Sequence, residues 1–359
     1  GKFSFAKFRQ DVKIIDPVTN IETVKKEKIE IGAVDFVVAK YNPLLGKLLI
    51  DAKPNNIIIN KNGEKYASAY YENVKYEASA SAYSLYQIFN KNLSDEAALL
   101  DQLSWDSVLE ITNLKTAIED VRIKADRLAL NGSSYDIKDK TVSSEFGIDV
   151  KGLSIDNSTD KTDMTYNLVL ENFSKEAVLA GIKFSNGFIS EKELAGKDKK
   201  GLAEKAMKDA AEYVSTLIDA IRAFDTNKTS IKLVNSSLRE YEVKDGKTTD
   251  TLELKMNVDL TLDEKLNPKG FVKFDVVTSD EEYQKDLDDE QAQRPNSQEV
   301  IKIFEKQSDT HYTFDLVAEG GNLKINNKDD INIDGMVKSG LDLVSGLISM
   351  LTLKAVVAQ

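Results

Sequence analysis

Residues 252–262 read Leu-Glu-Leu-Lys-Met-Asn-Val-Asp-Leu-Thr-Leu, with an apolar side chain at every second position. In an extended chain successive side chains point to opposite sides, so this period places all the apolar side chains on one face. The pattern predicts a β-strand with one buried face. The Asp245-Gly246 pair before it predicts a tight hairpin that joins it to an earlier strand.

The same alternation recurs along the chain, at residues 121–125, 146–150, 164–170 and 312–316. It is typical of an antiparallel sheet that is covered on one face only. The runs 28–40, 107–130 and 228–243 are longer than the usual strand of about five or six residues. We therefore expect a mainly β protein with a few helices (α+β), built on a long, twisted antiparallel sheet.

One helix is strongly indicated, at residues 200–224, where apolar residues recur at helical spacing from Leu202 to Phe224. Weaker helical patterns lie at residues 83–90, 95–104, 297–306 and 336–353. The apolar stretch at 341–358 contains Asp342 and Lys354 and is shorter than the roughly 20 apolar residues that span a bilayer, so we expect a buried terminal helix.

The composition excludes several classes of protein. The chain has 359 residues and a net charge of −12, which argues against a nucleic-acid partner because phosphate binding needs a cationic surface. It has no Cys, which removes thiol catalysis, disulfides and thiolate metal sites.

We expect one elongated β-rich domain over 1–359. The acidic segment 280–294 is predicted to be a solvated helix or loop, with a possible internal break near 280–296.

Catalytic and metal-binding patterns are missing or incomplete. His311 is the only histidine and precedes an alternating run, so we expect a solvent-facing strand residue and not a general base. Asp330-Ile-Asn332-Ile-Asp334-Gly335 copies the first half of a calcium loop, but Leu341 stands where the bidentate Glu is required. We therefore predict no enzyme activity, no catalytic residue, no metal site and no cofactor.

One glycosylation candidate stands out among the Asn-x-Ser/Thr sequences. Asp225-Thr-Asn227-Lys-Thr229 carries an acid two residues before the Asn, the longer form that the oligosaccharyl transferase of Campylobacter-like bacteria requires. It follows the predicted 200–224 helix, where we expect it to be accessible. Asn227 is the candidate acceptor.

A tyrosine-rich run at residues 66–76 is the candidate ligand-binding wall. Tyr66, Tyr70, Val74 and Tyr76 occupy even positions and share one strand face if no bulge intervenes, with Tyr71 on the other side. Tyrosine has a large apolar body and a polar tip, which suits a wall that lines a ligand. The same residues also suit aromatic packing in an ordinary core beneath the terminal helix.

Two stretches carry a family resemblance. The order of elements over residues 80–265, including Leu85–Phe89, Ser107–Lys115 and Gly181–Phe184, resembles the JlpA-type surface lipoprotein adhesins of Campylobacter. Residues 41–50 and the tail at 313–326 are similar to segments of Gram-negative envelope proteins, the tail to the YdgA-like ones. The resemblance implies a curved, incompletely closed half-barrel with an apolar concave face and helices at its ends and on one face. It also implies an N-terminal lipidated Cys as a membrane tether, which is not in this sequence.

From these features we expect a non-enzymatic protein of the bacterial cell envelope, as an outer-membrane surface lipoprotein or in the periplasm. Its partner would be a host-cell surface protein, in an adhesin, or an apolar ligand, held on an apolar sheet face that too few helices cover. A periplasmic lipid or lipoprotein carrier is the alternative, because the same groove would suit acyl chains.

Overall fold

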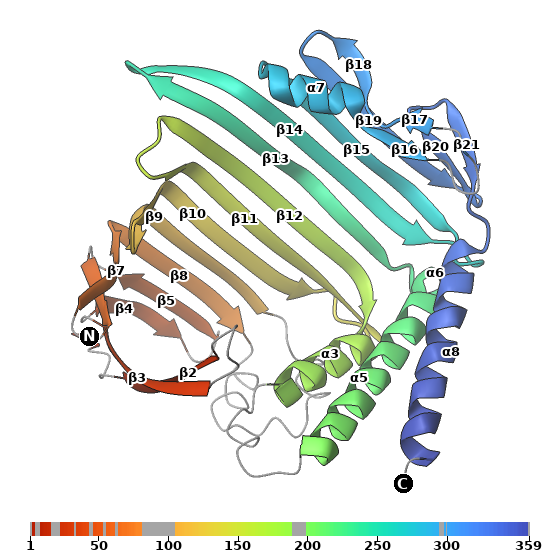
Figure 1. Ribbon diagram of the computed structural model, residues 1–359, viewed down its shortest axis with the longest axis horizontal. Helices are drawn as coiled ribbons and strands as arrows, with labels where there is room; N and C mark the ends of the chain where they lie inside the picture. The colour runs from red at the N-terminus through yellow and green to blue at the C-terminus, as the bar shows by residue number, and fades with distance from the viewer. Residues whose placement is uncertain are drawn as a thin grey trace.

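The chain is described by a computed structural model at residues 2–3, 8–15, 22–31, 34–42, 46–52, 55–61, 64–80, 105–188, 199–293, 298 and 300–357. Across these ranges, nineteen strands form one sheet whose strand pairs are all antiparallel, and a separate two-stranded ribbon joins β16 (Gln291–Gln293) to β17 (Val300–Lys302). The sheet is strongly curved and does not close into a barrel (Figure 1). The predicted mainly β fold with an incompletely closed antiparallel sheet is confirmed.

The N-terminal strands form two ribbons that meet at β9 (Trp105–Ile118). One half of β9 pairs with β7 (Glu64–Tyr71), and the other half pairs with β8 (Asn73–Ala80). Beyond β7 lie β6 (Asn55–Lys61), β3 (Glu22–Ile31) and β2 (Phe8–Ile15). Beyond β8 lie β5 (Lys47–Ala52), β4 (Val34–Asn42) and β1 (Lys2–Phe3).

From β9 onward the sheet is a meander of long strands. Its members are β10 (Val121–Tyr135), β11 (Thr141–Ile155), β12 (Asp160–Ser174), β13 (Ser230–Lys244), β14 (Lys247–Leu262), β15 (Pro268–Thr278) and β19 (His311–Glu319). The far edge of β19 is shared by β18 (Glu305–Ser308) and β20 (Asn322–Ile325), and β20 pairs with β21 (Asp329–Asn332).

The helices gather at the ends of the strands. Three of them, α3 (Lys175–Phe188), α5 (Lys199–Arg222) and α8 (Met336–Val357), lie together at one end, with the short α6 (Phe224–Asn227) after α5 (Figure 1). The predicted helices at 200–224 and 336–353 are confirmed. The described part of the terminal helix is not buried as we expected, because it packs along one side against α5 and leaves Met336 54% and Leu343 64% exposed. In the described part of the chain, no helix combines the length and apolarity needed to cross a bilayer.

Other helix predictions had mixed outcomes. The acidic segment forms α7 (Glu281–Asp289), where the Asp280 carboxylate accepts hydrogen bonds from the amides of Glu282 and Tyr283. The helix expected at 297–306 is wrong: this stretch contains β17 and the start of β18. The apolar residues in that stretch pair with neighbouring strands, which overrides its weak helical spacing. The candidates at 83–90 and 95–104 lie outside the described residues.

Turns divide two of the runs that we expected to be unusually long strands. Residues 107–130 contain a two-residue turn at Glu119-Asp120, where Glu119 has a φ of 53° and Ile118 pairs with Val121. Residues 28–40 are shared between β3 and β4. The hairpin predicted at Asp245-Gly246 is confirmed, because φ is 50° and 74° at its two central residues. Positive φ at both central residues is required by a type I′ turn, whose backbone twist matches that of the two paired strands.

Irregularities in the ladders accompany the curvature of the sheet. The register shifts in β11, β12 and β13, and left-handed backbone occurs beside several of these shifts, at Gly152 (φ 61°), Asn172 (φ 52°) and Asn235 (φ 51°). An extra residue in one strand bends that strand and increases its twist. Residue types that tolerate positive φ therefore stand where the sheet bends.

A small core lies where α7 crosses the sheet. Leu252, Val276 and Tyr312 are buried together, and Leu287 of α7 and Phe304 pack against them. The Tyr312 hydroxyl donates to the Gln284 carbonyl oxygen at 3.4 Å, which ties the helix to β19. The helix therefore covers this end of one sheet face.

The opposite, polar face of the sheet carries charge pairs between neighbouring strands. Arg127 Nε donates to Glu110 Oε1 at 3.1 Å, and Arg127 also pairs with Asp149 on its other side. Lys232 Nζ donates to Glu171 Oε2 at 2.7 Å, and Ser230 Oγ donates to the same oxygen at 2.7 Å. These two hydrogen bonds hold the pKa of the Glu171 carboxyl group below its ordinary value, and the bond from Lys232 has the larger effect.

We predict that Met256→Asp destabilises the protein strongly while Asn257→Asp has little effect. Met256 lies on the apolar face and Asn257 is exposed on the other. An unpaired carboxylate among apolar side chains should lower the free energy of unfolding by about 2 kcal/mol or more. The exposed change should cost less than about 0.5 kcal/mol. Urea unfolding of both variants is the measurement, and equal effects would contradict the assignment of the two faces.

A second prediction concerns the acid dependence of stability. Because the pKa of Glu171 is lowered by folding, its contribution is present above the unfolded pKa of about 4.3 and is lost as the pH falls through the folded value. Lys232→Met should lower the free energy of unfolding at neutral pH by up to about 1 kcal/mol, since the pair is partly exposed. Urea titrations should show this difference shrinking toward about pH 3. A difference that is constant with pH would contradict the assigned hydrogen bond.

Candidate apolar binding face

The strand register gathers apolar residues from distant parts of the chain into continuous rows. Residues directly opposite each other on antiparallel strands share a face. One row crosses nine neighbouring strands, from β8 to β19, without a polar residue. Its members are Val74, Ile111, Leu128, Val150, Met164, Leu238, Leu254, Val276 and Tyr312.

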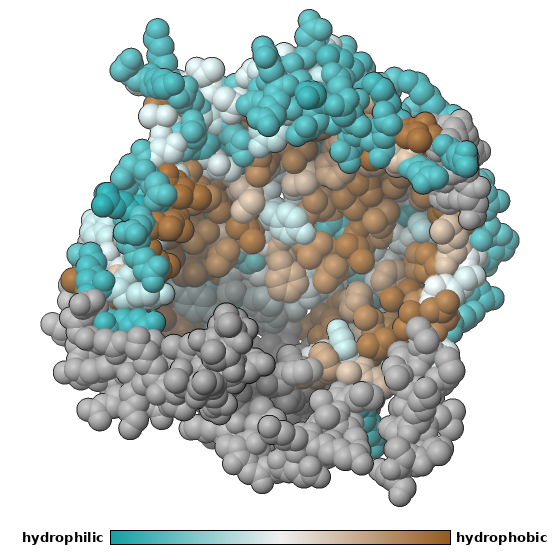
Figure 2. Space-filling model, viewed as in Figure 1, coloured by the Kyte–Doolittle hydropathy of each residue, from teal (hydrophilic) through white to brown (hydrophobic). Residues whose placement is uncertain are grey.

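Two more apolar rows lie beside the first, both on the same side of it and one after the other along the strands. One comprises Tyr76, Leu109, Leu130 and Ile148. The other comprises Phe146, Leu168, Leu233, Val258, Val272, Leu316 and Ile325. These three rows are called the apolar face. Figure 2 shows apolar residues on the concave side of the sheet, with hydrophilic residues around the upper rim.

Coverage of the apolar face is uneven. Beneath α7, Tyr312 is 0% exposed and Val276 is 4% exposed. On β10 and β11, in contrast, Leu130 is 38%, Ile148 36% and Phe146 42% exposed. Large apolar side chains that lie side by side and keep this much contact with water are favourable sites for an apolar ligand. The part of the face on β10 and β11 is therefore best suited to binding.

An aromatic pair borders this open region. The Trp105 and Phe146 ring centroids are 6.3 Å apart. A Cβ atom at Gly132 would lie 2.6 Å from the Trp105 ring, so the indole lies where only glycine leaves room for it. Nothing in the sequence singles out Trp105, Leu130, Phe146 or Ile148 as a group. The alternation at 146–150 indicated a strand, but the exposure of its side chains depends on strands elsewhere in the chain.

The four predicted wall residues do not form one strand face. Tyr66 and Tyr70 belong to β7, Val74 and Tyr76 belong to β8, and the chain bends between them at Glu72. The Glu72 amide donates to the Thr112 carbonyl oxygen at 3.1 Å, beside Asn113 with its φ of 51°. This irregularity breaks the period of two on which the prediction depended.

The two halves of the predicted wall have different surroundings. Val74 and Tyr76 continue the apolar rows. The Lys61 and Lys115 ammonium groups lie 5.2 and 5.4 Å from the ring centroids of Tyr66 and Tyr70, as in cation–π contacts. Tyr71, expected on the opposite side from the wall, is 6% exposed. Of the four residues, only Val74 and Tyr76 are therefore placed to line the apolar face.

His311 and the calcium-like sequence occupy structural positions. His311 begins β19 and is partly exposed, with Nε2 3.2 Å from Asp275 Oδ2. Asn332 Oδ1 accepts a hydrogen bond from the Asp334 amide, and Asp334 Oδ1 accepts one from Asn267 Nδ2, both at 2.9 Å. Ile331 lies in β21, so the first part of the calcium-like sequence is a strand and not a loop. Among described residues, no three acidic or histidine side chains gather as a metal site would require.

The glycosylation candidate is less accessible than we expected. Asn227 is partly buried at the end of α6, and Thr229 of the same sequence is 1% exposed. The Thr229 hydroxyl donates to the Asn172 carbonyl oxygen at 2.9 Å. Modification of Asn227 therefore stays a prediction, and in the folded chain it would require this segment to open.

Comparison with known proteins yields no relative: no family model, curated protein or solved structure matches the chain. Its functional assignment therefore depends on the chemistry of its own surfaces. The apolar face offers extensive apolar contact, which favours binding of an apolar group over polar recognition.

We predict that Tyr76→Ala weakens binding of the apolar fluorescent probe N-phenyl-1-naphthylamine about tenfold, or ~1.4 kcal/mol. Tyr70→Ala should leave probe binding unchanged, because this ring lies beneath Lys115 and not in the apolar rows. Fluorescence titration measures both affinities, with thermal midpoints as the folding control. Equal losses of affinity in the two variants would contradict the assignment of these tyrosines to different surroundings.

Proposed function

We propose that this chain is a non-enzymatic binding protein of the bacterial cell envelope that holds an apolar ligand on its apolar face. The observation that carries the proposal is the exposure of Leu130, Phe146 and Ile148, which lie next to one another in the apolar rows on β10 and β11. A concave surface lets several of these side chains contact one ligand together. Each ligand group that displaces water from them contributes favourable transfer free energy.

The chemistry of the rows favours a ligand without charge. The row from Val74 to Tyr312 contains no charged residue, and the charge pairs of Arg127 and Lys232 lie on the polar face. A buried charge without a partner is costly, so a charged group would remain at the rim. Apolar side chains of a protein partner and acyl chains both meet this requirement.

The adhesin form of the proposal draws on the resemblance to JlpA-type surface lipoproteins. In that form the apolar face binds apolar side chains of a host-cell surface protein, and an N-terminal lipid provides the tether. The alternative is a periplasmic carrier of lipids or lipoproteins. The width of the apolar rows favours the carrier, because an acyl chain has no polar groups and needs no hydrogen-bonding partner along its length.

Native mass spectrometry of the purified chain tests the proposal and separates its two forms. A co-purified lipid adduct supports the carrier. Absence of lipid together with saturable binding to host cells supports the adhesin. Absence of both lipid and cell binding, with no affinity for apolar probes, would refute the proposed function.

A matched pair of variants tests the surface itself. Ile148 is 36% exposed on the apolar face, and Val277 is 38% exposed on the polar face. We predict that Ile148→Ser weakens binding of the lipid or host-cell partner about tenfold, or ~1.4 kcal/mol, while Val277→Ser leaves it unchanged. Lipid occupancy or a cell-binding isotherm measures the effect. A larger loss of affinity in Val277→Ser would indicate that the ligand binds on the polar face and would contradict the proposal.

A further inference from the structure

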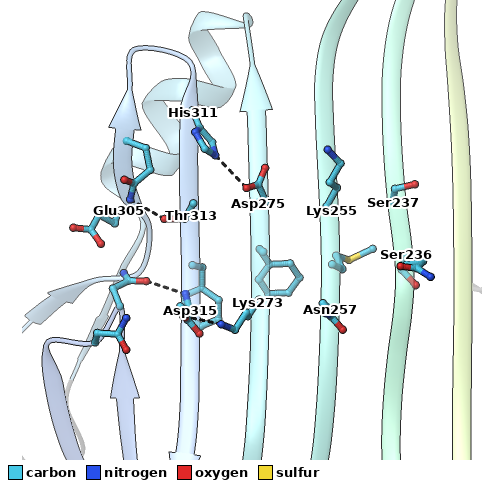
Figure 3. A pocket seen from close by; sticks show the side chains of 17 residues that line it. Ser236, Ser237, Lys255, Asn257, Lys273, Asp275, Glu305, His311, Thr313 and Asp315 are labelled. Carbon is cyan, nitrogen blue, oxygen red and sulfur yellow. Dashed lines mark hydrogen bonds and ion pairs between the residues drawn. The ribbon is translucent and has the colours of Figure 1, made fainter.

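A second hollow lies on the polar face of the sheet, across from the apolar face. Its volume is about 940 Å³, within the range of small-molecule sites. Figure 3 shows the side chains that line it. Its floor includes one row of register partners, namely Ser237, Lys255, Asp275 and Thr313. This row is offset by one residue from an apolar row, so the two surfaces are formed by alternate residues of the same strands.

The wall of the hollow is rigidly held. Asn326 and Asn327 form a turn with φ values of 50° and 57°. The Asn326 amide donates to the Asp315 carbonyl oxygen at 2.7 Å, and Asn326 Oδ1 accepts from the Asp315 amide at 2.9 Å. Asn326 Nδ2 also donates to the Ile303 carbonyl oxygen at 2.9 Å. A wall fixed in this way loses little conformational freedom on binding a ligand.

The charged side chains in the hollow already have partners. Lys273 Nζ lies 3.1 Å from Asp315 Oδ2, and His311 Nε2 lies 3.2 Å from Asp275 Oδ2. Lys255 pairs with Glu253 at 3.0 Å, and Glu305 pairs with Lys328. A charged ligand would have to compete with these existing pairs. The hollow therefore favours a polar ligand without net charge.

Neutral hydrogen-bonding groups, in contrast, are free. The side chains of Ser237, Asn257 and Asn327 make no hydrogen bond to any residue in the described ranges, and both asparagines are exposed. Each amide presents a donor and an acceptor side by side, and the serine hydroxyl serves as either. Adjacent hydroxyl groups of a sugar also both donate and accept, so they match this set.

We propose that the hollow binds a neutral saccharide through Ser237, Asn257 and Asn327. A peptide partner is disfavoured because an extended peptide adds to the open edge of a sheet, whereas this hollow lies on the face of paired strands. The saccharide site is independent of the proposed function, since Ser237, Asn257 and Asn327 lie outside the apolar rows. An experiment that refutes the saccharide site would leave the proposed function standing, and the reverse is also true.

Calorimetric titration of the full chain tests the proposal with two neutral probes, maltotetraose and the N-acetylglucosamine tetramer, and with anionic sialyllactose for comparison. Asn257→Val and Ser237→Val remove polar groups at strand positions that valine suits. Thr249→Val is the matched control, because Thr249 is exposed on β14 outside the hollow. Thermal midpoints check that all three variants fold.

The expected result is binding of a neutral probe that weakens about tenfold in each of the two hollow variants and is unchanged in Thr249→Val. If one hollow variant fails to fold, the other decides the outcome. The proposal is overturned if neither neutral probe binds the unmodified chain, if only sialyllactose binds, or if a folded hollow variant binds as tightly as the control.

Discussion

Cross-strand register is the constraint on which the rest of this structure depends. In an antiparallel sheet, a slip of one residue would exchange the faces of an entire strand. Here the register keeps Val74 opposite Ile111 and continues through seven more strands to Tyr312. The shifts in β11, β12 and β13 bend the sheet locally without breaking this row. The apolar face and the polar hollow both follow from that alignment.

The sheet is stabilised without having both faces covered. Long ladders of backbone hydrogen bonds join the strands, and charge pairs such as Arg127 with Glu110 and Asp149 connect three of them on the polar face. Among the residues that the structure describes, the fully buried cluster lies beneath α7, around Tyr312. The exposed side chains on β10 and β11 therefore contribute less to folding than buried ones would, and they remain able to contact a ligand.

The two proposed sites use alternate residues of shared strands. By strand register Met256 and Phe274 belong to the apolar face, although they also border the hollow, while Lys255 and Asp275 belong to the polar face. A substitution at one position therefore changes one surface directly and the other only through the backbone. This arrangement allows an apolar ligand and a polar one to be bound independently by the same sheet.

The sequence by itself determined the elements whose signals are local. The alternation at 252–262, the Asp245-Gly246 turn and the amphipathic pattern of α5 depend on residues that are neighbours in the chain. Tertiary structure alone decided that the tyrosine run is divided at Glu72. At this point Glu72 bonds to Thr112 of β9, next to Asn113 with its left-handed backbone. The tertiary structure also decided that residues 300–302 and 305–306 belong to strands, that Phe146 remains exposed and that Asn257 lines a hollow. These outcomes depend on strands far apart in the sequence, and no local period encodes which of them lie side by side.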